Sequence, residues 1–150
     1  MTQIRLVGED GDRGPQSPPV VAIFCGSRDF DDRTIIETLV HGVQSVATLR
    51  GRPFVLVEGE ARGADTLSRV EAEALGVTVV KCPADWDQHG KRAGVLRNVA
   101  MLKLYKPDLV IAFSDDIENS AGTRHMATIA RKAGVPVYVV SRFGDNRSSQ

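Results

Sequence analysis

Three short segments of the sequence combine glycine with side chains that can hold an anion. They are GSRDF, EGEARGAD and SDDIENSAGT, which begin at Gly26, Glu58 and Ser114. Glycine lets a backbone approach a ligand closely, hydroxyl groups donate hydrogen bonds, and the planar guanidinium of arginine fits phosphate or carboxylate. These residue types favour a phosphate-bearing ligand. We expect contacts with it from Gly26, Ser27, Arg28, Asp29, Gly59, Glu60, Arg62, Gly63, Asp65, Ser114, Ser120, Gly122 and Thr123.

Each segment alone also has a plainer interpretation. GSRD could be an ordinary turn with a solvated Arg28, Gly63 could only permit tight packing, and Asp65 could only cap a helix. Three such segments that meet in one crevice favour a binding site instead. The GxGxxG and P-loop signatures are absent, which excludes a standard NAD domain and a Walker ATPase.

A fourth segment, PADWDQHGKRAGVLRN from Pro83 to Asn98, is interpreted as a long loop that acts as a lid. Trp86 could stack on a base or a sugar, Lys91 or Arg97 could meet a phosphate, and Asn98 could bind a polar edge. The alternative is that Trp86 packs into the core while Lys91 is solvated.

Two histidines and two cysteines lie near these segments without forming a recognisable reactive group. His89 and His125 match no nucleophilic dyad, and neither is expected to act as a ligand or a base. Cys25 and Cys82 have no metal-type spacing and are interpreted as buried thiols in a reducing compartment. We expect no metal and no cofactor.

Elements that could position these residues alternate along the chain. Five runs rich in β-branched residues are interpreted as buried parallel strands, at 20–24, 54–57, 77–82, 109–113 and 135–140. Helical spacing separates them, with Asp31 and Asp32 as possible N-caps and Gly76 and Gly134 at C-cap positions. This alternation predicts an α/β, Rossmann-like, doubly wound sheet with helices on both faces. A strand order of 3-2-1-4-5 brings the loops after strands 1, 2 and 4 into one crevice.

Composition and charge limit the function classes. The chain has 150 residues, of which 42% are hydrophobic and 25% charged, as in an ordinary soluble domain. Lys plus Arg and Asp plus Glu both number 19, so no overall positive field attracts nucleic acid. No apolar run suits a membrane helix. We expect a cytoplasmic protein with a domain at 20–140 between flexible tails at 1–19 and 141–150.

The segments GSRDF, GEARGAD, DWDQHGKRAGVLRN, IAFSDDIENSAGT and AGVPVYVV together resemble the YspA-like branch of the SLOG superfamily. That superfamily includes the LONELY GUY phosphoribohydrolases and the Smf/DprA proteins. The resemblance implies a Rossmann-like fold that binds nucleotides or nucleotide-derived signals such as ADP-ribose derivatives. It also implies a sensor in bacterial or phage conflict and a homodimer or higher homo-oligomer.

Two departures from the family pattern bear on mechanism. Met126 occupies the position of the glutamate in the GGxGTxxE pattern of the hydrolytic relatives, and Glu60 replaces a glycine. A thioether cannot perform acid–base work. We therefore favour a binding module without catalytic residues. The alternative is an N-glycosidase or phosphoribohydrolase acting on nucleoside monophosphates through Glu58, Glu60 or Asp65. Binding of single-stranded DNA is disfavoured by the neutral charge and the few aromatic residues.

Overall fold

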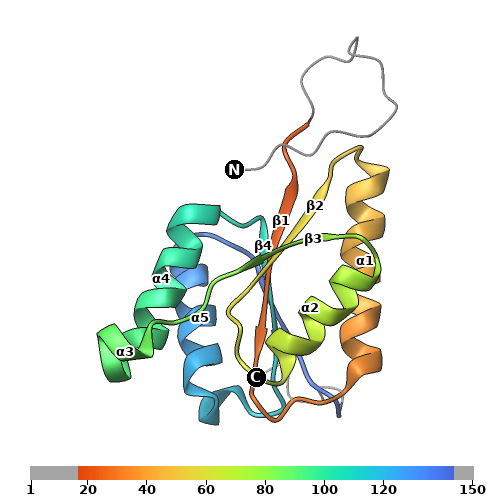
Figure 1. Ribbon diagram of the computed structural model, residues 1–150. Coiled ribbons are helices and arrows are strands. Elements are labelled where there is room, and N and C mark those ends of the chain that lie inside the picture. The colour runs from red at the N-terminus through yellow and green to blue at the C-terminus, as the bar shows by residue number, and fades with distance from the viewer. Residues whose placement is uncertain (1–16, 144–150) are drawn as a thin grey trace.

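A computed structural model of the chain describes residues 17–143 as a parallel sheet between two layers of helices (Figure 1). The strands are β1 (Val20–Gly26), β2 (Phe54–Glu58), β3 (Thr78–Lys81), β4 (Leu109–Phe113) and β5 (Val137–Val140). The helices are α1 (Arg33–Leu49), α2 (Ala64–Ala74), α3 (Trp86–His89), α4 (Ala93–Tyr105) and α5 (Ala121–Lys132), with short 3-10 turns η1 (Gly90–Arg92) and η2 (Ile117–Asn119).

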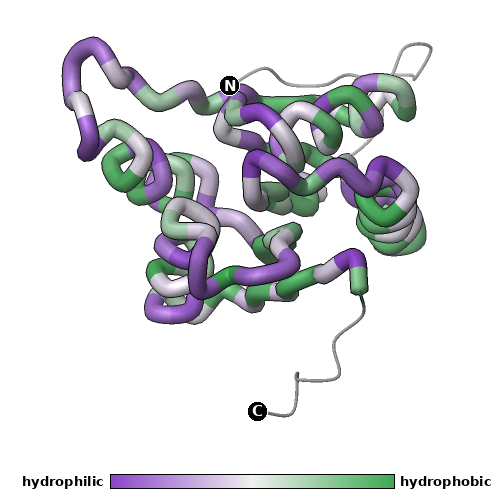
Figure 2. Tube along the Cα trace, turned by 90° about the horizontal axis from the view of Figure 1, so that it is seen from below, coloured by the Kyte–Doolittle hydropathy of each residue, from purple (hydrophilic) through white to green (hydrophobic). Residues whose placement is uncertain are grey.

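The strand order is β3-β2-β1-β4-β5, and all four pairings are parallel. In the centre, Ala22 of β1 lies opposite Leu56 of β2 and Leu109 of β4. The predicted order and the Rossmann-like fold are thereby confirmed. Because parallel strands end at the same edge, the loops after β1, β2 and β4 leave the sheet side by side. Figure 2 shows the chain from this side, coloured by hydropathy, with hydrophilic residues in the loops.

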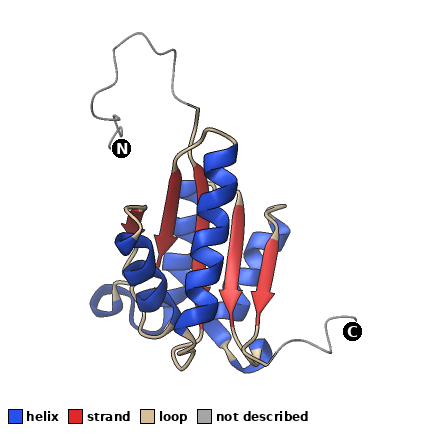
Figure 3. Cartoon of the chain, turned by 90° about the vertical axis from the view of Figure 1, so that its right-hand side faces the viewer, coloured by secondary structure: helices blue, strands red, loops and turns tan. Residues whose placement is uncertain are grey.

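The two faces of the sheet carry separate apolar clusters. Helices α1 and α2 cover one face, where Ile36 and Val40 are fully buried, and α4 and α5 cover the other with Met101, Met126 and Ala130 (Figures 1 and 3). Each helix buries one stripe of side chains against the strands. The doubly wound arrangement predicted from the alternation is present.

The outer strands differ from the expectation that all five strands are buried. Strands β1, β2 and β4 are mostly buried, but β3 and β5 are at the edges and partly exposed. Tyr138 and Val139 of β5 keep 56% and 41% of their surface in contact with solvent. An edge strand has one neighbouring strand and incomplete helix cover, which its β-branched composition does not reveal.

Local signals account for several helix ends. Asp32 caps α1 by accepting a hydrogen bond from the N–H of Ile35 at 3.1 Å, as predicted. Gly76 and Gly134 adopt positive φ angles of 75° and 80° directly after the C-caps of α2 and α5. These are the left-handed residues that end helices. Asp31, the other proposed cap, pairs with Arg142 instead.

The segment from Pro83 to Asn98 is not the long loop that the sequence analysis expected. It is helical from Trp86 onward, through α3, η1 and the start of α4. Asp85 begins α3 by accepting a hydrogen bond from the N–H of Gln88 at 3.0 Å. The predicted loop is therefore mostly helical and forms a rim of the pocket through Trp86 and Lys91.

The proposed tails at 1–19 and 141–150 lie mostly outside the described residues. Within them, the carbonyls of Pro18 and Pro19 accept hydrogen bonds from Arg52, and Ser141 and Arg142 contact Asp115. The domain boundaries stay a prediction. Among helices of residues 17–143, none has the length and apolar character needed to cross a bilayer.

Candidate functional site

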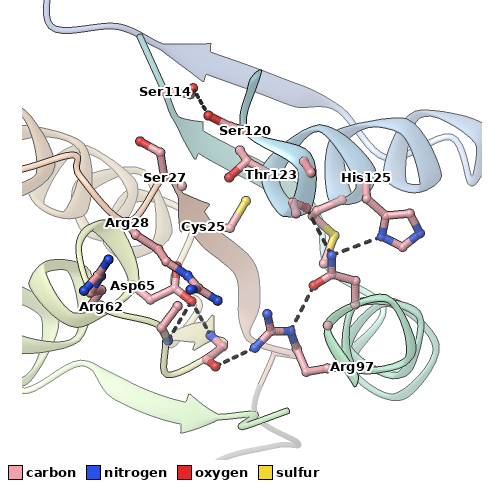
Figure 4. A pocket seen from close by; sticks show the side chains of 18 of the residues that line it. Cys25, Ser27, Arg28, Arg62, Asp65, Arg97, Ser114, Ser120, Thr123 and His125 are labelled. Carbon is pink, nitrogen blue, oxygen red and sulfur yellow. Dashed lines mark hydrogen bonds between the residues drawn. The ribbon is translucent and has the colours of Figure 1, made fainter. Parts of the chain in front are cut away.

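A cavity of about 820 Å³ opens at the carboxyl ends of β1, β2 and β4 (Figure 4). Its volume is typical of sites for small molecules. All but two of the predicted site residues line it, namely Gly26, Ser27, Arg28, Asp29, Gly59, Arg62, Asp65, Trp86, Lys91, Arg97, Asn98, Ser114, Ser120, Gly122 and Thr123. The predicted convergence of the loops that carry Arg28, Arg62 and Thr123 is confirmed.

The pocket also takes in residues that the sequence analysis did not select. They are Cys25, Ala61, Gly94, Val95, Met101, Asp115, Asp116, Asn119, Ala121, His125 and Met126. Val95, Met101 and Met126 make part of the wall apolar. Helical spacing is the signal that could have identified His125, because it lies three residues after Gly122 and hence on the same face of α5.

Glu60 and Gly63 are the two predicted residues that do not line the pocket. Glu60 is exposed with φ of 58°, and its N–H donates to Glu58 at 2.6 Å. Gly63 supports the site from behind: a Cβ there would lie 2.5 Å from the carbonyl oxygen of Arg28 and 2.6 Å from that of Ser27. The plainer interpretation of Gly63 as a packing residue therefore fits.

Gly26 also serves packing, although it lines the pocket. A Cβ at this position would lie 2.5 Å from the carbonyl oxygen of Phe113 in β4 and 2.6 Å from Cβ of Ala64 in α2. The backbone of Gly26 thus lies close to β4 and α2, whereas the sequence analysis expected a close approach to a ligand. The N–H of Ser27 then donates to the Phe113 carbonyl at 2.9 Å, which aims the β1–α1 loop across the end of the sheet.

Asp65, buried at the start of α2, organises the loop that follows β2. Its carboxylate accepts hydrogen bonds from the N–H groups of Gly59 at 3.1 Å and Ala61 at 3.3 Å. Burial raises the pKa of Asp65 to about 6, opposed by these two hydrogen bonds and by the charges of Arg97 and Arg28. Asp65 therefore holds the β2–α2 loop in place while it lines the pocket.

A chain of hydrogen bonds crosses the pocket from β2 to α5 (Figure 4). Arg97 donates to the carbonyl of Gly59 at 2.5 Å and, through Nε, to Oδ1 of Asn98 at 3.0 Å. Because arginine only donates, the Asn98 amide must present its NH₂ group to Gly122 O at 3.2 Å and His125 Nδ1 at 3.1 Å. Because the Asn98 NH₂ group donates to it, Nδ1 of His125 acts as an acceptor. Burial lowers the pKa of His125.

Cationic side chains without acidic partners surround the opening. Arg28, Arg62 and Lys91 are exposed, and none forms an ion pair with another residue of the described part of the chain. Four acidic residues also line the pocket, but Asp65 is held by backbone N–H groups and Asp115 by Arg142. Asp29, beside Arg28, and Asp116 form no ion pair with another described residue, so the opening carries three such cations and two such carboxylates.

The N-terminus of α5 faces the same space. Ser120 occupies the N-cap but makes no capping hydrogen bond with its side chain, since its hydroxyl is engaged by Ser114 at 2.9 Å and by the carbonyl of Asp116 at 3.0 Å. The N–H groups of Gly122 and Thr123 thus retain donor capacity at the positive end of the helix dipole. Such a terminus favours an anion.

Sulfur-containing side chains, among them Cys25 and Met126, line the pocket. Burial raises the pKa of the Cys25 thiol, the nearby charge of Asp65 acts in the same direction, and the thiol stays protonated. Met126, at 1% exposure, brings a thioether into the lining of the pocket. Within residues 17–143, no group of His, Cys, Asp and Glu side chains is arranged to hold a metal ion.

Glu58 lies beside the pocket but is not part of its lining. It is fully buried, its Oε1 accepts from Glu60, and its Oε2 has no hydrogen-bond partner, with Nε of Arg69 at 3.9 Å. Burial raises its pKa from 4.5 to about 7, the Glu60 N–H lowers it, and Asp65 raises it further. The sequence analysis had offered Glu58 as an alternative acid, and its enclosure removes it from contact with a ligand.

The raised pKa of Glu58 predicts a specific dependence of stability on pH. Between about pH 4.5 and 7 the folded chain binds this proton while the unfolded chain does not, so the free energy of unfolding falls as pH rises. The glutamine of Glu58→Gln is uncharged at every pH, so this variant should lack the Glu58 contribution to the fall. That contribution is at most about 3 kcal/mol in the free energy of unfolding. Urea denaturation at pH 5 and pH 8 measures it, with exposed Glu37→Gln as the control. An equal slope in wild type and Glu58→Gln would contradict the assignment.

Comparison with known proteins agrees with this geometry. Residues 19–89, which carry the loops after β1 and β2 and the rim at Trp86, match the model of the YspA, cpYpsA-related SLOG family. A relative from Mycobacterium phage D29, Gene 61 protein, is 38% identical over 130 residues, which cover 82% of this chain and 95% of the relative. The chain belongs to the SLOG family. The match confirms the resemblance seen in the sequence.

Proposed function

We propose that the pocket binds a phosphate-bearing nucleotide or nucleotide-derived molecule, of which an ADP-ribose derivative is one example, and that it leaves this ligand intact. The observation that carries the proposal is the meeting of three cations with the open N-terminus of α5 around a cavity of about 820 Å³. These cations, Arg28, Arg62 and Lys91, form no ion pair with another residue of 17–143. Family membership supports a nucleotide-related role.

The two sides of the pocket suit the two parts of a nucleotide. A phosphate would lie between the Arg28 loop and the Gly122–Thr123 turn, where charge and N–H donors act together. A base or ribose would lie toward α3 and α4. There, Trp86 is 51% exposed at the rim and packs beside Gly94, so its ring face can stack on a ligand. At this exposure, Trp86 is not packed into the core, which was the alternative interpretation of its sequence.

Binding is favoured over hydrolysis by the positions of the acidic groups. Glu58 is enclosed behind the lining, Glu60 points outside it, and Asp65 accepts two backbone hydrogen bonds. Met126 cannot exchange a proton or stabilise an oxocarbenium ion. No carboxylate among these is therefore placed to assist departure of a base.

The biological role would be that of a sensor or a sequestering protein, which fits a relative encoded by a phage. Self-association and a cytoplasmic location are further parts of the proposal that follow from the family resemblance and the composition.

Incubation with AMP, ADP, ADP-ribose and adenosine tests both parts of the proposal. We expect a rise in melting temperature with at least one phosphate-bearing compound and recovery of every compound unchanged by chromatography, because no acid is positioned for cleavage. Steady release of free adenine by the unmodified protein, abolished by Asp65→Asn or Glu60→Gln, would make the chain an N-glycosidase.

A further inference from the structure

Arg142, directly after the end of β5, lies between two of the pocket loops. Its Nε donates to Oδ2 of Asp115 at 2.6 Å, and its Nη2 forms an ion pair with the same oxygen. Its Nη1 donates to Oδ1 of Asp31 at 2.5 Å. One guanidinium therefore joins the β4–α5 loop, which carries Asp115, to the β1–α1 loop, which carries Asp31.

Asp115 is enclosed by this segment from several directions. Its Oδ1 accepts the N–H of Arg142 at 2.8 Å and the hydroxyl of Ser141 at 3.2 Å, in addition to the contacts of the guanidinium with Oδ2. These hydrogen bonds and the positive charge outweigh desolvation and hold the pKa of Asp115 below its usual range. Asp115 also lines the pocket, so its charge lies where a ligand phosphate would enter.

The guanidinium of Arg142 is supported from below by the core. Its carbon lies 5.5 Å from the ring centroid of Phe30, which is 1% exposed and packs on Phe113 at a centroid distance of 5.3 Å. A cation over an aromatic face is attracted to it. Phe30 belongs to the β1–α1 loop, and Phe113 ends β4, so the contact is anchored in the same two elements that Arg142 joins.

We propose that Arg142 is a positioning residue of the pocket. It ties the β4–α5 loop to the β1–α1 loop and neutralises Asp115, so that an anion can enter between Arg28 and the α5 N-terminus without facing a free Asp115 carboxylate. The effect on ligands rests on the proposed function, whereas the tie between the loops does not. Surface ion pairs are individually weak, but a planar arginine that binds two carboxylates and an aromatic face combines several contacts.

Amide hydrogen exchange tests the tie without any ligand. In Arg142→Ala we expect faster exchange in residues 27–32 and 114–120 and unchanged exchange in α1 and α4. The matched control is Arg131→Ala, which removes an exposed arginine from the last turn of α5, away from the pocket. Unchanged exchange in both loops of Arg142→Ala would overturn the positioning role, even if nucleotides bind.

Affinity tests the neutralisation. For whichever of AMP, ADP and ADP-ribose binds most tightly, Arg142→Ala should weaken binding about fivefold or more, with Arg131→Ala unchanged. Adding Asp115→Asn to Arg142→Ala should recover a large part of the lost affinity, because the double variant no longer has the Asp115 carboxylate that repels the phosphate. If Arg142 acted only by holding the two loops together, this second substitution would recover no affinity. Absence of recovery would overturn the electrostatic part. If the wild type binds none of the three compounds, the proposed function fails, and hydrogen exchange still decides the tie.

Discussion

Replacing Arg28 with alanine is expected to weaken binding of the phosphate-bearing ligand by more than about tenfold while the fold stays intact. Arg28 is exposed at the pocket, has no ion pair with another described residue, and is proposed to contact phosphate. A hydrogen bond to a charged group contributes roughly 1.5–3 kcal/mol, and 1.4 kcal/mol corresponds to a factor of ten. Isothermal titration of wild type and variant measures the change.

Companion variants separate a phosphate contact from a general loss of charge. Arg62→Ala should add to the effect of Arg28→Ala, since the two side chains come from different loops. Arg28→Lys should recover affinity only in part, because an ammonium cannot reproduce the planar fork. Arg131→Ala removes the same charge far from the pocket and should bind normally. A dissociation constant unchanged in Arg28→Ala would refute the phosphate contact.

Gly63→Ala should have the largest effect on stability. Gly63 has φ of 79°, and a Cβ there would lie 2.5 Å from the carbonyl oxygen of Arg28. With ψ of −127°, Gly63 lies in backbone space that glycine adopts far more readily than other residues, and a non-glycine residue there costs about 1–3 kcal/mol. Overpacking against a backbone adds about 1–3 kcal/mol. Chemical denaturation should therefore show a free energy of unfolding lower by about 2–6 kcal/mol. Ligand affinity should fall as well, because the Arg28 loop must move to make room.

Gly134→Ala is the matched control for this variant. Gly134 has nearly the same φ, 80°, but a Cβ there meets nothing within 4 Å. It should lose only the cost of its own positive φ, about 1–2 kcal/mol, and bind ligand normally. Equal losses of stability in Gly63→Ala and Gly134→Ala would show that the close contact between the β1–α1 and β2–α2 loops contributes little.

The main outline of the fold could be predicted because local and global signals agree. Alternating β-branched and helical segments specify parallel strands, Asp32 marks the start of α1, and Gly76 and Gly134 mark helix ends. The exposure of β3 and β5 could not be predicted, because an edge strand and a central strand of parallel sheet have similar compositions. The short helix at Trp86 was missed because its cap, Asp85, lies two residues after Pro83 in a segment whose composition is otherwise typical of loops.

The site could be predicted at the level of loops but not of individual roles. The carboxyl ends of neighbouring strands must meet, which brings Arg28 and Thr123 together. Whether a glycine or an acid in such a loop faces the ligand depends on packing from distant segments. Gly63 faces backbone because α2 crosses the β1–α1 loop there, and Glu58 is enclosed because Arg69 of α2 lies over it. Arg142 lies outside every segment that the motifs single out, and only the folded chain brings it to Asp115.

The most direct measurement of the central claim is a titration that follows the fluorescence of Trp86, the single tryptophan of the chain, at the pocket rim. AMP, ADP and ADP-ribose are compared with adenosine, which shares the base and ribose but has no phosphate. The account predicts that at least one phosphate-bearing compound changes the fluorescence saturably and binds at least about tenfold more tightly than adenosine, as expected for one charge-assisted contact. Failure of all three to bind, or equal affinity for adenosine, would contradict it.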